Sequence, residues 1–316
     1  MNQIDANKTQ LGLVGVGAMG SRMAQRLLAR GYKLAAYDLM RTKAEDLMVD
    51  GATVADSLAA LAGTAKVILS CLTDDEAVRR VYLATDGILA HAAQDTLILE
   101  MSTIRPQTSR ELARAGADRG MHVLDVAISG STPVMEQGMV TLLCGGESEV
   151  FAVVEPIFQT IAKQYFHLGP AGSGTAAKLV VNALLGIGMQ AIAEACALGE
   201  SQALDREQLL TVLSKTAVVA PAHVGKLLRA VRNDYGPQFP LRLMNKDFRL
   251  ILETASNFNL ELPVTEAAFQ VNSEALALGP EQDFSIVIQE MESRAQEHMH
   301  KRSVPKEWSA ARSYSG

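Results

Sequence analysis

The chain has 316 residues, which at about 150 residues per domain corresponds to about two domains. Apolar residues make up 48% and charged residues 20%, an ordinary globular composition that excludes a largely disordered chain. The formal net charge of −6 argues against a nucleic-acid partner or an anionic membrane surface, because binding to either requires a cationic field.

The N-terminus and the cysteines indicate the compartment. The first ten residues, MNQIDANKTQ, are polar and lack the apolar segment of a secretory signal. Cys71, Cys144 and Cys196 lie far apart and in no CxxC spacing, so neither a disulfide framework nor a thiolate metal site is indicated. Apart from His298 and His300 near the end, the histidines also lack metal-ligand spacing. We expect a cytoplasmic protein without a metal.

From residue 11 to about 168, short apolar runs alternate with amphipathic stretches. Strands that alternate with helices imply crossover connections, so residues 1–168 are predicted to form an α/β Rossmann domain with a doubly wound, mostly parallel sheet. Thr73 and Glu76 have the spacing of a capping box, and Pro106 suits a first helical turn. The predicted strands read LGLVGV, KLAAYD, KVILSCL, TLILEMS, HVLDVAIS and VTLLCGG.

The first predicted strand runs into a glycine-rich turn of the form GxGxxG. A helical pattern follows, and then a second strand that ends at Asp38, 18 residues after Gly20. In this context the pattern predicts a dinucleotide-binding turn, in which Gly15 permits the tight turn, Gly17 admits the pyrophosphate and Gly20 allows close packing. A turn that needs glycine only for packing is the alternative. The predicted cofactor-binding residues are Gly15, Val16, Gly17, Ala18, Met19 and Gly20.

Two charged residues after the second strand bear on the choice of cofactor. Asp38 is suited to accept hydrogen bonds from the ribose hydroxyls and to repel a 2′-phosphate, which favours NAD. Arg41 is instead suited to receive that phosphate, so NADP also stays possible. As an alternative role, the Asp38 carboxylate caps the helix predicted to begin at Thr42.

After residue 169 the pattern becomes helical. One long apolar helix is predicted over about 175–202, joining the Rossmann domain to an all-α domain that covers 169–316. Its longest uncharged stretch, 179–193, is shorter than the roughly 20 residues of a membrane span, so a buried helix is predicted and no membrane. The polar segment 298–316 is expected to be mobile or to lie on a partner subunit. Further helices are predicted at about 205–217, 221–233, 242–257, 264–278 and 284–297.

Five separated motifs resemble those of the β-hydroxyacid dehydrogenases, the group of 3-hydroxyisobutyrate dehydrogenase and tartronate semialdehyde reductase. The resemblance covers roughly residues 10–297, and the last three motifs are specific in combination. The motifs are GLVGVGAMG, EMSTIRP, DVAISGSTPVMEQG, GSGTAAKLVVN and NKDFRL.

The resemblance implies that Lys178 is the catalytic acid/base and that Asn182 orients the lysine and the substrate. The residues agree, because Lys178 and Asn182 are four apart on a predicted helix and therefore leave the same face. A cation on such an apolar helix is costly unless it is used, and desolvation favours the neutral amine that accepts a proton. The alternative is a lysine whose stem extends to solvent.

The resemblance also assigns binding residues. It implies that Ser129 and Gly130 hold the substrate carboxylate, and Ser131, where this chain departs from the family, adds a further hydroxyl that we expect to contact the substrate. The alternatives are a simple turn at Ser129 and Gly130, a solvated charge at Lys246, the predicted nicotinamide contact, and an N-cap role for Thr103. Asp247 is expected to pair or to cap. The further cofactor contacts implied are Leu72, Thr73, Thr103 and Lys246.

Departures from the family pattern lie around the substrate loop. Ser131 and Val134 stand where the family commonly has glycine, and Met135 stands where it has alanine, so a bulkier loop is expected. Thr73 replaces the usual proline of the cofactor contact. The identity of the substrate therefore stays open.

Together, these features predict an NAD(P)-dependent oxidoreductase that interconverts a small 3-hydroxy acid and its semialdehyde, as a homodimer or homotetramer. One alternative is an oxidative decarboxylase of a phosphorylated sugar acid that resembles 6-phosphogluconate dehydrogenase. That relative has a histidine and a glutamate where this chain has Val181 and Leu185. The other alternative is a dinucleotide-binding module without catalysis, which the presence of Lys178 disfavours.

Overall fold

The computed structural model describes residues 4–303. By its internal contacts the chain divides into an N-terminal unit, Met1–Val181, and a C-terminal unit, Asn182–Gly316. This division falls inside one continuous helix, α9 (Ser173–Ser201), whereas the sequence-based division at 168/169 precedes it. The first nine residues of α9, including Lys178, therefore belong with the sheet.

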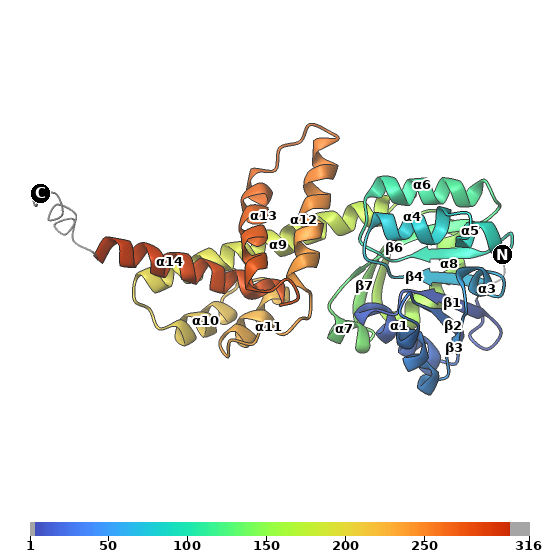
Figure 1. Ribbon diagram of the computed structural model, residues 1–316, viewed down its shortest axis with the longest axis horizontal. Coiled ribbons are helices and arrows are strands. Elements are labelled where there is room, and N and C mark those ends of the chain that lie inside the picture. Colours follow the sequence, from blue (N-terminus) through green and yellow to red (C-terminus); the bar gives the residue numbers. More distant parts are fainter. Residues whose placement is uncertain (1–3, 304–316) are drawn as a thin grey trace, which may run out of the picture. The chain divides into compact units, whose positions relative to one another are not determined.

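The N-terminal unit is built on a single eight-stranded sheet of order β3-β2-β1-β4-β5-β6-β7-β8 (Figure 1). Within residues 4–303, neighbouring strands run parallel except for the antiparallel pair β6–β7, which confirms the predicted mostly parallel sheet. The six predicted strands all form. The structure adds two that lack a strong apolar run, β3 and β8. The strands are β1 (Gln10–Val14), β2 (Lys33–Tyr37), β3 (Thr53–Val54), β4 (Val67–Ser70), β5 (Leu97–Glu100), β6 (His122–Ser129), β7 (Val140–Gly145) and β8 (Ala162–His167).

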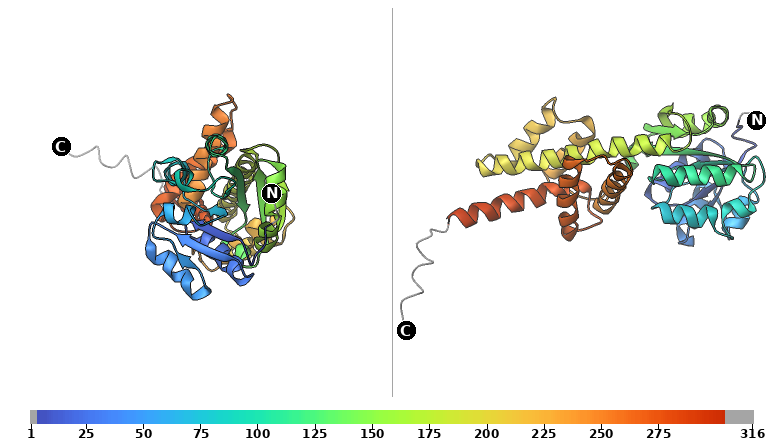
Figure 2. Two further views of the ribbon diagram at one scale, coloured as in Figure 1. Left: turned by 90° about the vertical axis from the view of Figure 1, so that its right-hand side faces the viewer. Right: turned by 90° about the horizontal axis from the view of Figure 1, so that it is seen from above.

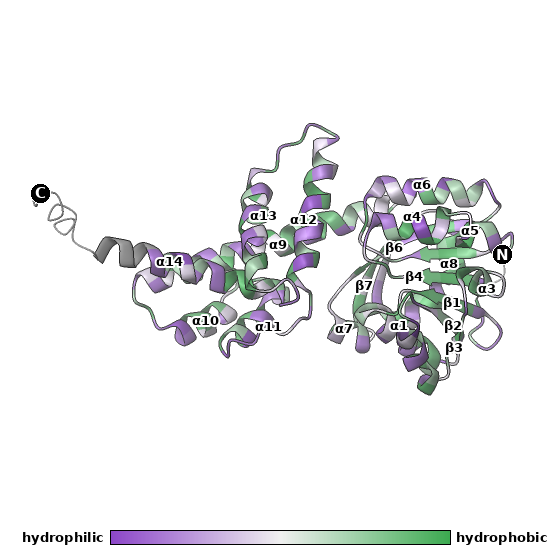
Figure 3. Ribbon diagram, in the orientation of Figure 1, coloured by the Kyte–Doolittle hydropathy of each residue, from purple (hydrophilic) through white to green (hydrophobic). Residues whose placement is uncertain are grey.

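Helices cover both faces of this sheet, because strand residues alternate between two apolar cores. Leu11 and Leu13 pack into the core beneath α1 (Ala18–Ala29), η1 (Asp46–Asp50) and α8 (Ser148–Ile161). Val14 follows Leu13 directly and therefore points to the opposite face. It packs into the core beneath α3 (Leu58–Ala62), α4 (Asp75–Leu83), α5 (Ile88–His91) and α6 (Pro106–Ala117). The apolar strands β1 and β4 stand out in green in Figure 3. This two-sided burial explains the short, continuous apolar runs in the sequence.

Two helix starts test the predicted capping. Helix α6 begins at Pro106 as predicted, after the N-cap Arg105. The predicted capping box at α4 is wrong by one residue, because the N-cap is Asp74, whose Oδ1 accepts a hydrogen bond from the Ala77 N–H at 2.8 Å. The Thr73 hydroxyl donates to the other Asp74 oxygen at 2.9 Å. A carboxylate is the stronger acceptor for an orphan helix N–H, so Asp74 takes the position.

Helix α9 is the longest element, with 29 residues in one unbroken run where 175–202 was predicted (Figure 2). By length and hydropathy this helix could cross a membrane, whereas the uncharged stretch 179–193 considered in the sequence is too short to do so. Core helices of soluble proteins can have the same length and hydropathy, and 44% of the apolar window is buried here. The helix therefore gives no independent support for a membrane.

The C-terminal unit is helical, as predicted. Helices α12 and α13 lie side by side in Figure 1, as do α10 and α11. The last helix extends to Ser303, so the segment 298–316, which was expected to be mobile or to lie on a partner subunit, begins as helix, and its remainder, 304–316, lies outside the described residues. The helices are α10 (Arg206–Lys215), α11 (Pro221–Ala230), α12 (Leu241–Ser256), α13 (Pro263–Ala275), η2 (Leu276–Leu278), η3 (Phe284–Ile286) and α14 (Val287–Ser303), and two short helices of the first unit are α2 (Arg41–Glu45) and α7 (Thr132–Glu136).

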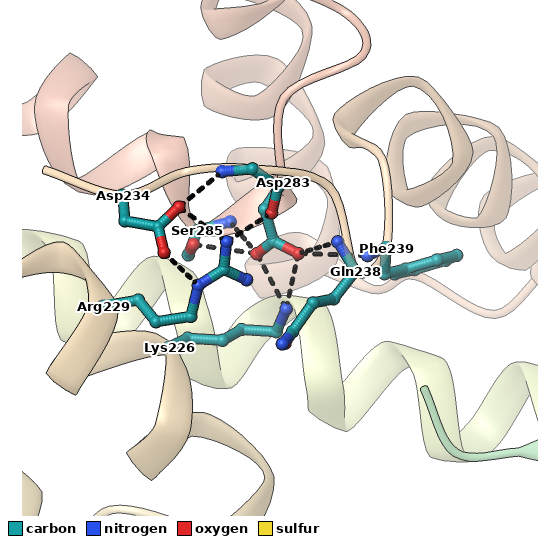
Figure 4. Close-up of polar contacts among 8 residues, drawn as sticks. Lys226, Arg229, Asp234, Gln238, Phe239, Asp283 and Ser285 are labelled. Atoms are coloured by element: carbon teal, nitrogen blue, oxygen red, sulfur yellow. Dashed lines mark hydrogen bonds and ion pairs between the residues drawn. The ribbon is translucent and has the colours of Figure 1, made fainter. Parts of the chain in front are cut away.

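A buried ion pair ties three segments of the C-terminal unit together (Figure 4). Lys226 of α11 donates to both carboxylate oxygens of Asp283 at 2.7 Å. Asp283 also accepts from the Phe239 N–H at 3.0 Å and from the Ser285 hydroxyl at 2.8 Å. Burial opposes ionisation of Asp283, but the ammonium and these donors outweigh it and lower the pKa of that carboxyl. The pair fixes α11 against the loop before α12 and against η3.

Candidate active site

The predicted binding residues of the N-terminal unit gather where the strands of the sheet end. The glycine turn follows β1, Asp38 follows β2, Thr73 follows β4, Thr103 follows β5 and Ser129 ends β6. These strands are parallel, so their carboxyl ends share an edge. The strand order reverses direction between β1 and β4, the position at which doubly wound sheets bind ligands.

Two of the three turn glycines are required by the protein itself. Gly15 has a φ of +92°, and a Cβ there would collide with the carbonyl oxygen of Cys71. A Cβ on Gly20 would collide with the carbonyl oxygen of Gly15. A side chain at either position would thus disturb the contact between the turn, α1 and the loop after β4.

Gly17 is different, because a Cβ there would meet nothing within 4 Å. Its φ of −78° is open to any residue, so neither packing nor backbone strain explains the glycine. Gly17 is also the N-cap of α1, which has no side-chain cap and no acidic residue in its first turn. An open backbone approach to an uncapped helix N-terminus fits a dinucleotide pyrophosphate.

Asp38 braces the turn. Its Oδ2 accepts from the Val16 N–H and its Oδ1 from the Met40 N–H, both at 2.8 Å. The N-cap of α2 is Met40, so the alternative role of Asp38 as the cap of that helix is wrong. A pocket of about 170 Å³ beside it is lined by Asp38, Arg41 and six neighbours. Asp38 thus lies where the ribose of a dinucleotide bound to this turn is expected.

The guanidinium of Arg41 already has two carboxylate partners. Its Nε donates to Glu45 and one terminal nitrogen donates to Asp56, both at 2.8 Å. A 2′-phosphate would have to compete with these two carboxylates for the same group.

A chain of hydrogen bonds joins the ends of β4 and β5 below the turn. The Leu72 N–H donates to the Ser102 hydroxyl at 2.7 Å, and the Ser102 N–H donates to Glu100 at 2.9 Å. Leu72 is therefore held against Ser102, the residue before Thr103. The alternative role of Thr103 as the N-cap of α6 is wrong, because that cap is Arg105.

The predicted substrate loop leaves β6 at Ser129. Gly130 has a φ of +151°, and a Cβ there would lie 2.8 Å from a methyl carbon of Val140. Within residues 4–303, the hydroxyls of Ser129 and Ser131 make no hydrogen bond to another residue, although Ser131 is the N-cap of α7. Met135 is fully buried in the core, so only Ser131 and Val134 add atoms to the loop itself, which is less bulky than expected.

Lys178 lies in the second turn of α9 and is only 9% exposed. This burial excludes the alternative of a stem that extends freely to solvent. The start of α9 is held by Asp125, a carboxylate in the middle of β6 that the sequence reasoning did not single out. The available signal was a lone carboxylate in an apolar strand, which is costly to bury unless it has partners.

Three more predicted residues meet in the C-terminal unit. The Asn182 amide donates to Asp247 at 2.5 Å, and Asp247 forms an ion pair with Lys246 at 3.2 Å. Asn182 is 1% exposed, and its Oδ1 has no hydrogen-bond partner within the described part of the chain. Because a carboxylate accepts only from the amide nitrogen, Asp247 fixes which way the Asn182 oxygen points. Lys246 is paired and largely buried, so it is not the solvated charge considered above.

Comparison with known families finds matches over most of the chain. A model described as the NAD binding domain of 6-phosphogluconate dehydrogenase matches residues 10–169. A second, described as the NAD-binding domain of NADP-dependent 3-hydroxyisobutyrate dehydrogenase, matches residues 172–291. The two matches meet immediately before α9.

Individual proteins match along almost their full length. An NAD-dependent L-serine dehydrogenase of Pseudomonas aeruginosa is 34% identical, over 88% of this chain and 96% of its own. A 3-hydroxyisobutyrate dehydrogenase of the same organism is also 34% identical, over 88% of this chain and 97% of its own. Among solved structures, Mycobacterium tuberculosis 3-hydroxyisobutyrate dehydrogenase with L-serine has a TM-score of 0.81 at 29% identity, covering 89% of this chain and 98% of that one.

Proposed function

This chain belongs to the β-hydroxyacid dehydrogenase family, and on that premise we propose that it is an NAD(P)-dependent dehydrogenase that interconverts a small 3-hydroxy acid and its semialdehyde. Lys178 acts as the acid/base. The observation that carries the proposal is a buried lysine on α9, one helical turn before an asparagine whose amide oxygen is buried and unpartnered within residues 4–303.

In the proposed mechanism, each protein group binds the substrate or moves a proton. Ser129 and Ser131 donate hydroxyl hydrogen bonds, and Gly130 its N–H, to the substrate carboxylate. During oxidation the Lys178 amine accepts the hydroxyl proton of the substrate, and during reduction its ammonium returns a proton to the aldehyde oxygen. Asn182, oriented by Asp247, supplies an acceptor that fixes the reacting group. A nicotinamide cofactor, which the glycine turn, Asp38 and Lys246 would hold, would supply the hydride chemistry at the carbinol carbon.

The second hydroxyl of the loop bears on the substrate. Ser131 stands where the family commonly has glycine, and its hydroxyl makes no hydrogen bond to other residues within 4–303. Ser131 is half-buried, and a bound substrate that covers its hydroxyl without pairing it would leave a donor unsatisfied, so this position favours a substrate with a second polar group near the carboxylate over one with only a methyl. The L-serine dehydrogenase relative acts on an acid of that kind.

NAD is the proposed physiological cofactor. Asp38 places a carboxylate beside the ribose position, and Arg41 is occupied by Glu45 and Asp56. Both features disfavour a 2′-phosphate, the first by repulsion and the second by competition.

We further propose a cytoplasmic homodimer or homotetramer. Apolar side chains on one face of α9 are exposed in the single chain, with Val180 at 65%, Leu184 at 70% and Leu198 at 66%. A stripe of this kind on a long helix is typical of a subunit interface.

The deciding experiment is Lys178→Ala. Binding of NADH, followed by fluorescence, is expected to persist while turnover falls by about two to four orders of magnitude, because the acid/base group is lost. Lys215→Ala, which removes an exposed lysine of α10, is the matched control and is expected to retain turnover. Wild-type turnover in Lys178→Ala would refute the assignment.

The same assays separate the rival functions. A panel of 3-hydroxy acids and semialdehydes with both cofactors identifies the substrate. Release of carbon dioxide in step with cofactor reduction would favour the decarboxylase, whereas tight NADH binding without turnover on any member would favour a binding module.

A further inference from the structure

We propose that Asp125 is a positioning residue that fastens the helix of Lys178 to the strand of the substrate loop. The proposal rests on the function proposed above, because it concerns the placement of the acid/base group. Asp125 lies in the middle of β6 and is 2% exposed.

The carboxylate holds the first turn of α9 through two backbone donors and a hydroxyl. The Gly172 N–H donates to Oδ1 at 2.8 Å, and the Thr175 N–H donates to Oδ2 at 2.7 Å. The Thr175 hydroxyl lies 3.2 Å from the same Oδ2. Asp125 thus serves as the N-terminal cap of a helix that begins almost fifty residues later in the chain.

Two glycines let the helix approach the sheet. A Cβ on Gly174 would collide with the carbonyl oxygen of Leu143 and lie 2.7 Å from that of Asp125. A Cβ on Gly145, the cross-strand partner of Asp125, would lie 2.6 Å from the Asp125 carboxylate. The helix start therefore rests directly on the backbones of β6 and β7, and its position has little freedom.

The contacts of Asp125 connect the proposed acid/base group of the N-terminal unit to its proposed substrate loop. On the helix, Lys178 follows Thr175 by three residues and shares its face. On the strand, Ser129 follows Asp125 by four residues, about 13 Å of extended chain. Asp125 therefore links the helix that carries Lys178 to the strand that ends at Ser129, with few rotatable bonds between them.

Charge and shape both require an aspartate here. Two N–H donors and a hydroxyl meet two acceptor oxygens, and the charge-assisted bonds offset the cost of burial. An asparagine of nearly the same shape would keep one acceptor, but its NH2 group would face a second N–H. The helix start would then shift or fray, and Lys178 would move with it.

The test compares Asp125→Asn with Asp205→Ala. Asp205 caps α10 by accepting from the Gln208 N–H at 2.8 Å, so the alanine variant loses a helix cap far from the proposed chemistry along the chain. Both variants are expected to melt at lower temperature. Only Asp125→Asn is expected to lose kcat, by about tenfold or more, with a smaller change in KM and unchanged NADH affinity.

A double-mutant cycle identifies the residue through which Asp125 acts. If Asp125 positions Lys178, the substitution lowers kcat in the wild type but leaves the residual rate of Lys178→Ala unchanged. An equal fold-loss in both backgrounds would overturn the proposal, as would wild-type kcat in Asp125→Asn. If Asp125→Asn does not fold, Thr175→Val replaces it in the cycle, because it keeps the N–H bond to Asp125 and removes only the hydroxyl, which also contacts the Gly172 carbonyl at 3.1 Å and the Ser109 hydroxyl at 3.2 Å. Thr175→Ser is then expected to restore kcat.

The two proposals fail in different ways. Full turnover in Lys178→Ala would reject the acid/base assignment itself. A large loss in Lys178→Ala together with additive behaviour of Asp125→Asn would reject only the positioning role.

Discussion

At the scale of single residues, the three glycines of the first turn are glycine for different physical reasons. Gly15 and Gly20 are required by contacts within the protein, since a side chain at either would strike backbone. Gly17 faces open space, so no contact within residues 4–303 requires it. The GxGxxG pattern thus combines two folding requirements with one position that we propose is kept open for the cofactor.

This difference predicts opposite effects of two substitutions. Gly17→Val is expected to lower the melting temperature only slightly, because valine is a poorer N-cap but meets no other atom, and to weaken NADH binding by about tenfold or more, because the side chain takes the space proposed for the pyrophosphate. Gly20→Ala is expected to lower the melting temperature. Thermal denaturation and fluorescence titration measure both quantities, and unchanged NADH affinity in Gly17→Val would contradict the proposed role of that residue.

Residue types and spacing located the proposed site but not its supports. The turn, Lys178 and Asn182 were predicted because each lies in a local motif. The partners of these residues come from distant segments, as Asp125 lies 50 residues before Thr175 and Asp247 lies 65 after Asn182. Such pairings form only when elements pack, so no local pattern specifies them.

At the scale of elements, α11 is fastened to α9 through His223. The His223 side chain is 3% exposed, and its Nε2 donates to the Leu185 carbonyl at 2.9 Å. A Cβ on Gly188 would lie 2.7 Å from the ring. Burial lowers the pKa of His223 below its ordinary value of 6.5.

The lowered pKa makes stability depend on pH. As pH falls below about 6.5, the unfolded chain binds a proton at His223 before the folded protein does, so the folded state loses stability until its own lower pKa is passed. His223→Gln keeps a donor for Leu185 but does not titrate. Its melting temperature is expected to fall less than that of the wild type between about pH 7 and about pH 5. Parallel curves for the two proteins would count against this assignment.

The elements themselves were mostly predictable, and the exceptions share a cause. Strong apolar periodicity marked six strands and the helices of the second half. Strand β8, with sequence AKQYFH, has no such run, because five of its six residues are at least partly exposed at the sheet edge. The N-cap of α4 is Asp74 and not the predicted Thr73, because two adjacent side chains can accept the helix N–H and local spacing does not rank them.

At the scale of the whole molecule, the exposed apolar face of α9 predicts assembly. Leu184→Glu places a charge on that face and is expected to lower the mass measured by analytical ultracentrifugation, because the charge would be buried against a partner. Val212→Glu on α10, 58% exposed in the single chain, is the control for adding a charge at an apolar surface position. Equal masses for wild type and Leu184→Glu would place the interface elsewhere.

Because α9 is unbroken, it also constrains which mutations the gene can accept between Lys178 and Asn182. Between Lys178 and Asn182 the helix fixes a rise of about 6 Å, and each added residue turns the remainder of the helix by about 100°. Val180 lies on the exposed apolar face of α9 and Val181 is 37% exposed, so other apolar residues fit at either position, but the number of residues between Lys178 and Asn182 is fixed. Apolar substitutions there are therefore expected to preserve activity, whereas a one-codon insertion or deletion rotates Lys178 away from the face of Asn182 and is expected to abolish activity.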